Sequence, residues 1–119
     1  MDKFMQDTCD DIKNLLAQIE SKYQKHKNYD EYLKWDLEPA KENLLDSYHL
    51  RRIGYHLCTE FDDKEMAENV FEHAVNVAAY NEDGGVKDDK EELIDVLNDM
   101  TFLDEEAAKS QADLFDVEL

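Results

Sequence analysis

The sequence predicts an all-α fold, a compact bundle of about five helices in a single domain that spans residues 1–119. The chain holds one Pro and three Gly, whereas all-β folds need turn residues about every 8–12 positions. Hydrophobic residues make up 42% and aromatic residues 10% of the chain, which is enough for a core and more than disordered chains contain. The apolar residues also recur with the spacing of helices.

A long amphipathic helix is predicted over residues 3–25. Its apolar residues step by four and three positions, which places them on one stripe of the helix. The stripe consists of Met5, Cys9, Ile12, Leu16, Ile19 and Tyr23. Such a stripe forms one wall of a bundle or the seam of a coiled coil, so a homodimer through it is one possibility. Cys9 and Cys58 form no C-x-x-C pair, and we expect buried free thiols in a reducing compartment.

The middle of the chain is predicted to hold a short helical turn and a long central helix. Residues 28–38 are aromatic and irregular, with one turn around Tyr32–Trp35. Pro39 is expected to open the next helix at its first position, where a missing N–H is tolerated. That helix is expected to run to about Thr59 and to be central, because it is apolar on more than one face. Gly54 within it indicates close packing against a neighbour.

Three more helices are predicted in the second half. The first begins after Asp62, with Glu65 completing a capping box, and ends at the glycine-containing segment 81–85. The next spans about Asp88–Met100, and a weaker last helix spans about Asp104–Asp116. The residues expected to face the core in the first two are Met66, Val70, Ala74, Val77, Ala78, Leu93, Val96, Leu97 and Met100.

Negative charge is concentrated in the second half of the chain. Residues 60–119 contain 20 Asp and Glu against four Lys, whereas residues 1–59 contain 11 acids against nine Lys and Arg. A net charge of −18 disfavours nucleic acid and anionic lipid as direct ligands, because binding phosphate needs Lys and Arg. No apolar run reaches the roughly 18–20 residues of a membrane span. The N-terminus lacks the pattern of a signal peptide, so we expect a cytoplasmic protein.

Two rows of carboxylates are the candidate partner-binding residues. They are Glu65, Glu68 and Glu72 on one predicted helix, and Asp88, Glu91, Asp95 and Asp99 on the next. Helical spacing sets neighbouring carboxylates roughly 5–6 Å apart, which is of the order of the phosphate spacing along a nucleic-acid strand. The turn at Gly84 and Gly85 should make the two helices antiparallel neighbours. The alternative is a solvated face that serves solubility, but such a face usually alternates Lys with Glu.

In length, charge and predicted helicity the chain resembles small acidic helical inhibitors that mimic nucleic acid, such as phage anti-restriction and anti-CRISPR proteins. It is also similar to the immunity proteins of nuclease toxins. These proteins share no motif, so no residue role is carried over from them. The resemblance implies a bacterial protein without catalytic activity or cofactor that occludes the cationic site of a nucleic-acid-binding protein or nuclease complex. Association would be fast, and affinity would fall with salt.

A non-inhibitory adaptor is the first alternative. It would bind through the aromatic segment that contains Tyr29, Tyr32 and Trp35, because Tyr and Trp are enriched in binding hot spots. It would also use an apolar C-terminal tail, which could instead pack on the bundle or dock a second copy. The tail residues are Leu114, Phe115, Val117 and Leu119.

A ribonuclease is the second alternative. Arg51-x4-His56 resembles the R-x(4–6)-H pattern of HEPN ribonucleases, in which His is thought to act as acid and base and Arg to hold the scissile phosphate. The pattern lies mid-chain here, and the charge disfavours RNA. The ordinary interpretation is that Arg51 and Arg52 pair with nearby acids. No metal site is expected, because there is no Glu-x-x-His and no frame of an EF-hand loop fits.

Overall fold

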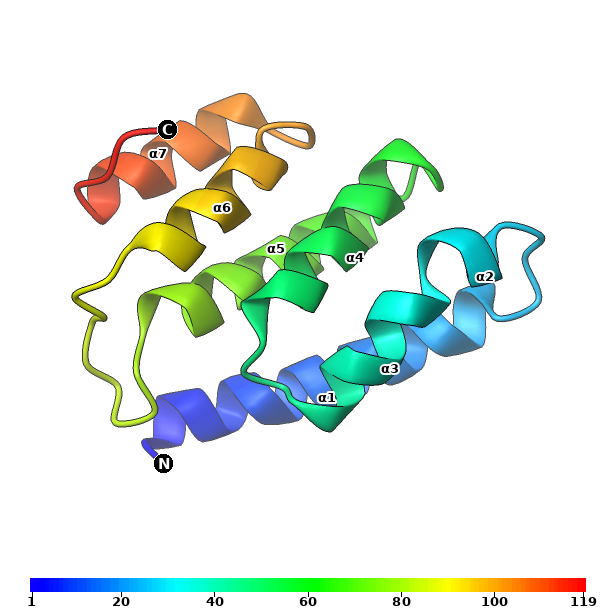
Figure 1. The fold of residues 1–119 in the computed structure, drawn as a ribbon, viewed down its shortest axis with the longest axis horizontal. Helices are drawn as coiled ribbons and strands as arrows, with labels where there is room; N and C mark the ends of the chain where they lie inside the picture. Colours follow the sequence, from blue (N-terminus) through cyan, green and yellow to red (C-terminus); the bar gives the residue numbers. More distant parts are fainter.

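The computed structural model describes residues 1–119 as seven helices, whose connections are short except for residues 80–90 between α5 and α6 (Figure 1). They are α1 (Lys3–Tyr23), α2 (Tyr29–Tyr32), α3 (Lys34–Glu42), α4 (Ser47–Thr59), α5 (Lys64–Ala79), α6 (Glu91–Met100) and α7 (Glu105–Leu114). A single antiparallel bridge joins Tyr80 to Val86 in the loop after α5. The all-α prediction is confirmed, but the number of helices is seven and not about five, because the middle of the chain is divided more finely.

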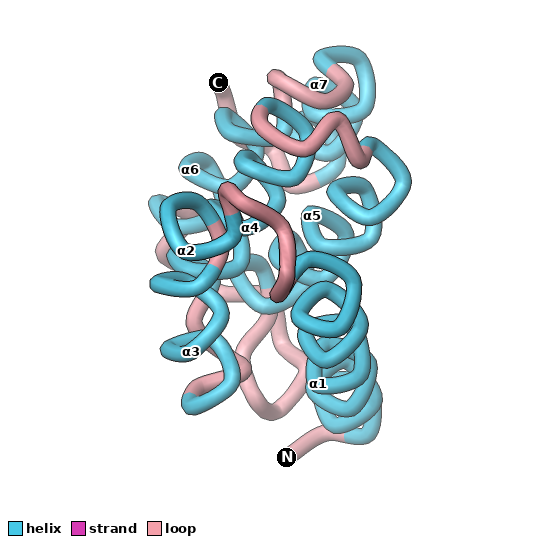
Figure 2. Tube along the Cα trace, turned by 90° about the vertical axis from the view of Figure 1, so that its right-hand side faces the viewer, coloured by secondary structure: helices cyan, strands magenta, loops and turns pink.

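The helices form two layers. Figure 2 shows α3, α4 and α6 along one side, here called the front layer, and α1, α5 and α7 along the other, the back layer. The Cα trace measures 40 × 31 × 19 Å, as two packed layers require. The contact between α4 and α5 is the most extensive between any two helices. These two helices therefore join the layers at the centre of the molecule.

The predicted stripe of α1 is confirmed, because all six of its residues are at most 8% exposed. They pack into the core of the same chain. The stripe is therefore covered and is not free to form the seam of a homodimer. The helix begins at the cap Asp2, whose carboxylate accepts a hydrogen bond from the backbone N–H of Phe4.

The prediction of one helix from Pro39 to Thr59 is wrong. Pro39 lies inside α3, and the chain leaves the helical conformation at Asn43 before α4 begins. The Asp46 side chain accepts a hydrogen bond from the Tyr48 backbone N–H at 3.0 Å, and so caps a new helix. This N-cap signal, an Asp before Ser47, is favourable in itself and divides the apolar run in two.

The start of α5 is one residue later than predicted, and Asp63 is its cap. The carboxylate of Asp63 accepts from the Met66 N–H at 3.2 Å, so Glu65 is not at the capping-box position. Asp62 instead adopts the left-handed conformation, with φ 50°. The other oxygen of Asp63 accepts from Lys22 Nζ and Tyr23 Oη, each at 2.6 Å. One carboxylate thus ends the loop and ties α5 to the end of α1.

The close packing expected at Gly54 is confirmed. A Cβ atom added there would lie 2.9 Å from Cε2 of Phe71 on α5, so only glycine lets α4 approach α5 this closely. In α6, all of the residues predicted to face the core are buried, although the helix begins at Glu91 and not at Asp88.

The C-terminal tail folds back over the bundle in part. The Val117 N–H donates to the Ala112 carbonyl at 2.9 Å, and the Phe115 ring meets the Tyr80 ring edge-on at 5.8 Å. Leu114 remains 72% exposed. Cys9 and Cys58 are free thiols, one buried and one partly buried. None of the seven helices combines the length and hydropathy needed to cross a membrane.

Candidate functional site

The glutamate row of α5 lies on the outer face of the back layer. Glu65, Glu68 and Glu72 are all exposed, because the opposite side of the helix carries the residues buried in the core. No Lys, Arg or His nitrogen lies within 4.0 Å of any of the three carboxylates. The row is therefore an uncompensated anionic strip on a helix that is fixed at its start and along its inner face.

A shallow groove of about 350 Å³ runs beside this row. Glu68 and Glu72 form one wall, and Met100 and Gln111 lie across from them, so the groove separates α5 from the end of α6 and from α7. No cationic side chain lines it. The groove extends the anionic strip without neutralising it.

The row predicted on α6 is only partly formed. Asp88 lies in the loop before the helix, so it does not continue the helical spacing of the others. Asp99 accepts a hydrogen bond from Nη1 of Arg51 at 2.7 Å, and both side chains are about one-fifth exposed. Only Glu91 and Asp95 remain as exposed helical carboxylates of this row without an ion-pair partner.

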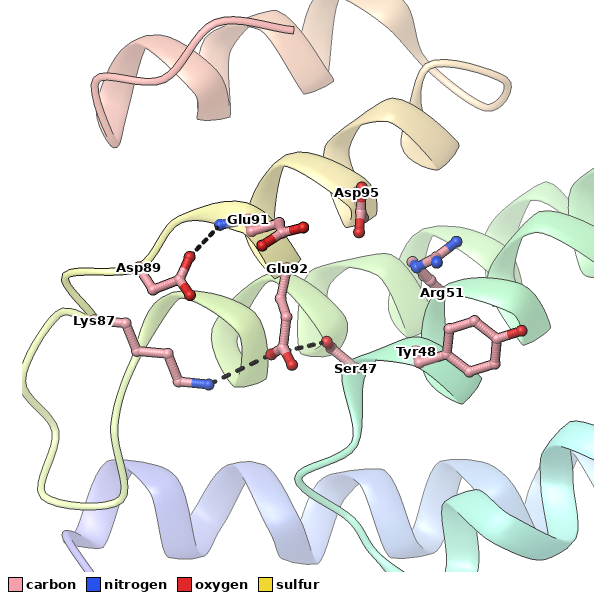
Figure 3. A pocket seen from close by; sticks show the side chains of 8 residues that line it. All are labelled: Ser47, Tyr48, Arg51, Lys87, Asp89, Glu91, Glu92 and Asp95. Atoms are coloured by element: carbon pink, nitrogen blue, oxygen red, sulfur yellow. Dashed lines mark hydrogen bonds and ion pairs between the residues drawn. The ribbon is translucent and has the colours of Figure 1, made fainter.

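Glu91 and Asp95 line a different groove, of about 470 Å³, between α4 and α6. Figure 3 shows Arg51 and Tyr48 of α4 on its other side. Nearby, Lys87 Nζ lies 3.6 Å from Glu92, so this groove mixes both signs of charge. The helices α5 and α6 do run in opposite directions as neighbours (Figure 1). Their acidic rows, however, border separate grooves and do not form one surface.

Most carboxylates of the second half are exposed and unpaired. Of the twenty in residues 60–119, all are exposed except Asp63 and Asp99, which are partly buried. Four of them, Asp63, Glu92, Asp99 and Glu105, lie within 4.0 Å of a cation. Sixteen of the twenty therefore have no ion-pair partner in the chain.

The aromatic segment mostly closes one end of the bundle. Tyr29 is 8% exposed, and the Tyr32 ring packs near His56 at 5.3 Å and near Phe61 at 6.4 Å. Trp35 differs, because it is 70% exposed. Of the three aromatic residues assigned to the adaptor alternative, only Trp35 presents most of its ring to solvent.

Arg51 and His56 contact different parts of the molecule. Arg51 pairs with Asp99 on α6, while the His56 ring packs between Tyr32 of α2 and Tyr55. Nδ1 of His56 is buried without a hydrogen-bond partner. These contacts hold the His56 imidazole and the Arg51 guanidinium in different surroundings, whereas cleavage of a phosphodiester by this pair would require both at one place.

A buried carboxylate that the sequence analysis missed joins α3 to α4. Asp36 is 6% exposed, and its Oδ1 lies 2.8 Å from Nδ1 of His49 and 3.4 Å from Nε of Arg52. Asp46 lies 3.8 Å from the other ring nitrogen of His49. The expectation that both arginines pair with nearby acids is thus confirmed. No group of three or more His, Cys, Asp or Glu side chains is arranged to hold a metal ion.

Comparison with protein-family models, with curated proteins and with solved structures finds no match to this chain. Function must therefore be argued from its own residues. The two features that set its surfaces apart are the unpaired acidic strip of α5 and the ion-paired, aromatic outer side of α4.

Proposed function

We propose that this protein is an inhibitor that binds a positively charged nucleic-acid-binding site on a target protein and occludes it. The observation that supports this most is the set of sixteen carboxylates in residues 60–119 that have no ion-pair partner in the chain. Repulsion among these negative charges destabilises the compact fold. This repulsion is relieved when a cationic surface covers the carboxylates. Its relief then contributes to the free energy of binding a basic partner.

The α5 row is the best candidate for the centre of the contact. Glu65 and Glu72 are seven residues apart, which corresponds to about 10 Å along a helix at 1.5 Å per residue. A groove that holds a nucleic-acid strand would meet fixed negative charges at a comparable spacing. Glu91 and Asp95 on α6 add to the negative electrostatic field from the front layer, and Asp88 adds to it from the loop between α5 and α6. The partly neutralised Asp99 contributes least.

The mechanism is occlusion without chemistry. The anionic field steers the protein to the cationic site, where it excludes DNA or RNA by occupying the same space. No cofactor or catalytic group takes part in this scheme. The setting that the proposal implies is the cytoplasm of a bacterial cell, in which a phage or plasmid counters a defence complex, or a toxin nuclease is held inactive.

The test is binding at two ionic strengths. The tagged protein is used to capture partners from bacterial lysate at about 50 mM and about 200 mM salt, a range over which contacts to polyanions weaken strongly. The captured protein is then purified, and its binding to labelled DNA or RNA is measured as the inhibitor is added. We expect affinity to fall steeply with salt, and inhibitor and nucleic acid to compete.

A charge reversal locates the contact. The triple variant Glu65→Lys, Glu68→Lys and Glu72→Lys should bind at least about 100-fold more weakly, since like charges set against each other cost several kcal/mol. The matched control makes the same change in net charge at exposed acids of the first half. It replaces Asp30, Glu31 and Glu38 by Lys. Equal losses in both variants would mean that only total charge matters, and an unchanged triple variant would refute the α5 contact.

One observation favours the adaptor alternative, namely the exposure of Trp35 at 70%. An adaptor that binds through this ring would lose its partner on Trp35→Ala and would be nearly insensitive to salt. The inhibitor would keep its partner in that variant and would lose it at high salt.

A further inference from the structure

The outer side of α4 gathers exposed rings and both arginines of the chain. Tyr48 is 49% exposed, and Phe102, in the turn after α6, is 64% exposed. The Arg51 guanidinium lies 4.9 Å from the centre of the Tyr48 ring, and the Tyr55 ring meets Phe102 edge-on at 5.0 Å. With Arg52, these five residues form what we call the α4 surface.

The α4 surface is hollowed and has the composition of a protein contact. A groove of about 390 Å³ is lined by Arg51, Arg52, Tyr55, Phe102 and Asp99. Tyr and Arg are the residues most enriched in binding hot spots, together with Trp. Phe102 does little for the packing of the monomer, because most of its ring faces solvent. A partner would bury what the bundle leaves exposed.

The charge on this surface is balanced, in contrast to the rest of the second half. Arg51 is paired with Asp99, and Nε of Arg52 lies 3.4 Å from Asp36. The Arg52 side chain is 42% exposed, and only its Nε takes part in that contact, so its two terminal nitrogens are free to donate. Glu91 and Asp95 stand close by across the α4–α6 groove, where they are exposed acceptors.

We propose that the α4 surface is the contact between two copies of this chain, related by a two-fold axis. A two-fold contact must be self-complementary, and this surface offers donors, acceptors and rings side by side. Arg52 of each protomer would contact Glu91 and Asp95 on α6 of the other protomer. Tyr48 and Phe102 of both protomers would pack at the centre of the contact. Elsewhere on residues 60–119, two copies would set unpaired carboxylates against each other.

Two further observations favour the α4 surface as the site where the second copy binds. The stripe of α1 is buried within the chain, which removes the other helical seam. The α5 row lies in the opposite layer from α4 (Figure 2). A dimer through α4 therefore leaves the α5 row of each protomer facing away from the contact. The inference does not depend on the proposed inhibition, because it concerns only the chain and its copy.

The dimer should strengthen with salt. Each protomer carries a net charge of −18, and the repulsion between two of them acts over roughly the Debye length, about 10 Å at 0.1 M and about 3 Å at 1 M salt. Contacts between touching rings are little affected by screening. The pairs between Arg52 and carboxylates are weakened by salt, but exposed pairs each contribute little, less than the repulsion that salt removes. Self-association thus has a salt dependence opposite to that proposed for binding a cationic target.

The experiment is sedimentation velocity of the full chain over a concentration series at low and high salt. We expect monomer at low salt and a growing dimer fraction at high salt. Phe102→Ala and, separately, Tyr48→Ala should weaken the dimer at least about tenfold. Both side chains are exposed, so helix content by circular dichroism should not change. Leu114→Ala, at a residue on α7 that is 72% exposed, is the matched control and should dimerise like the unmodified chain.

Two results would overturn the inference. One is a chain that stays monomeric up to about 1 mM, where association would be worth no more than about 4 kcal/mol. The other is a dimer that survives both Phe102→Ala and Tyr48→Ala; its loss in Leu114→Ala would then assign the contact to the C-terminal tail. Neither result affects target inhibition, and the Glu65, Glu68 and Glu72 reversals should leave the dimer intact.

Discussion

The outer faces of α4 and α5 lie on opposite sides of one helix pair and treat charge in opposite ways. On α4 each arginine has an acidic partner, Asp99 for Arg51 and Asp36 for Arg52. On α5 the outward glutamates have none. The same residue types therefore serve two purposes in this chain. Carboxylates paired within the chain stabilise its fold, whereas unpaired ones cost stability and stay available to another molecule.

The largest effect on stability is expected at the paired side. Asp36→Ala removes the buried carboxylate that contacts both His49 and Arg52, so both side chains lose their acidic partner. Breaking such a contact costs about 2 kcal/mol of unfolding free energy, measured by urea denaturation. Glu68→Ala on α5 should stay within about 0.5 kcal/mol of the unmodified protein, as substitutions at unpaired surface sites do. Similar losses in the two variants would erase the distinction between the faces.

The next largest effect is expected at the contact between α4 and α5, where Gly54 packs against Phe71. Gly54→Ala places a Cβ atom 2.9 Å from the Phe71 ring, and overpacking of this kind costs roughly 1–3 kcal/mol. The higher helix propensity of Ala returns about 1 kcal/mol. We expect a net loss of about 1 kcal/mol in a thermal or urea melt. Gly85→Ala is the control, since its Cβ would meet only the exposed Asp83 side chain at 3.2 Å.

A smaller and pH-dependent effect is expected at Asp63, a paired acid at the start of α5. Burial raises the pKa of Asp63, but hydrogen bonds from Lys22, Tyr23 and a backbone N–H outweigh it and hold the pKa below the ordinary value of 3.8. The unfolded chain then takes up the proton first on acidification. The stabilisation is complete above about pH 5 and is lost as the pH falls through the ordinary pKa and then through the lower pKa of the folded state.

Asp63→Asn isolates this contribution, because Asn caps helices about as well as Asp. The variant lacks the charge that Lys22 and Tyr23 bind, and charged hydrogen bonds are roughly twice as strong as neutral ones. We expect it to be less stable by somewhat under 1 kcal/mol at neutral pH, and the gap to close in acid. A gap that stays constant from pH 7 to pH 2 would contradict this role.

Periodicity along the sequence predicted the single-helix features well. The stripe of α1 and the buried side of α6 depend on residues a few positions apart, which helical geometry brings together. The close approach at Gly54 was indicated by a glycine inside a predicted helix, although its neighbour Phe71 lies on α5. The break between α3 and α4 was missed, because Pro39 and the apolar run around it suggested one helix. The N-cap at Asp46 instead begins a new helix, α4.

The sequence predicted that the arginines pair with acids, but not with which acids, because the partners depend on how the helices pack. Arg51 and Asp99 are 48 residues apart, and nothing local distinguishes Asp99 from Asp95, one turn earlier and exposed. Likewise, the acidic rows of α5 and α6 follow the same spacing rule, and only the two-layer arrangement sends them to separate grooves. Sequence identified the carboxylates, but the fold determines which of them remain free.

The smallest effect bears most directly on whether the α5 row is kept at a cost. Glu68 and Glu72 are four residues apart, and like charges at this spacing destabilise a helix by about 0.2–0.5 kcal/mol. Replacing both by Gln should therefore stabilise the protein by that amount in low salt, and by nothing at about 1 M salt, where the Debye length is about 3 Å. Glu65→Gln should have the opposite sign, because Glu65 lies in the first turn of α5, where a negative charge interacts favourably with the helix dipole. If the double variant is less stable than the unmodified protein, the two glutamates are stabilised by contacts within the chain, and the contrast between α4 and α5 no longer holds.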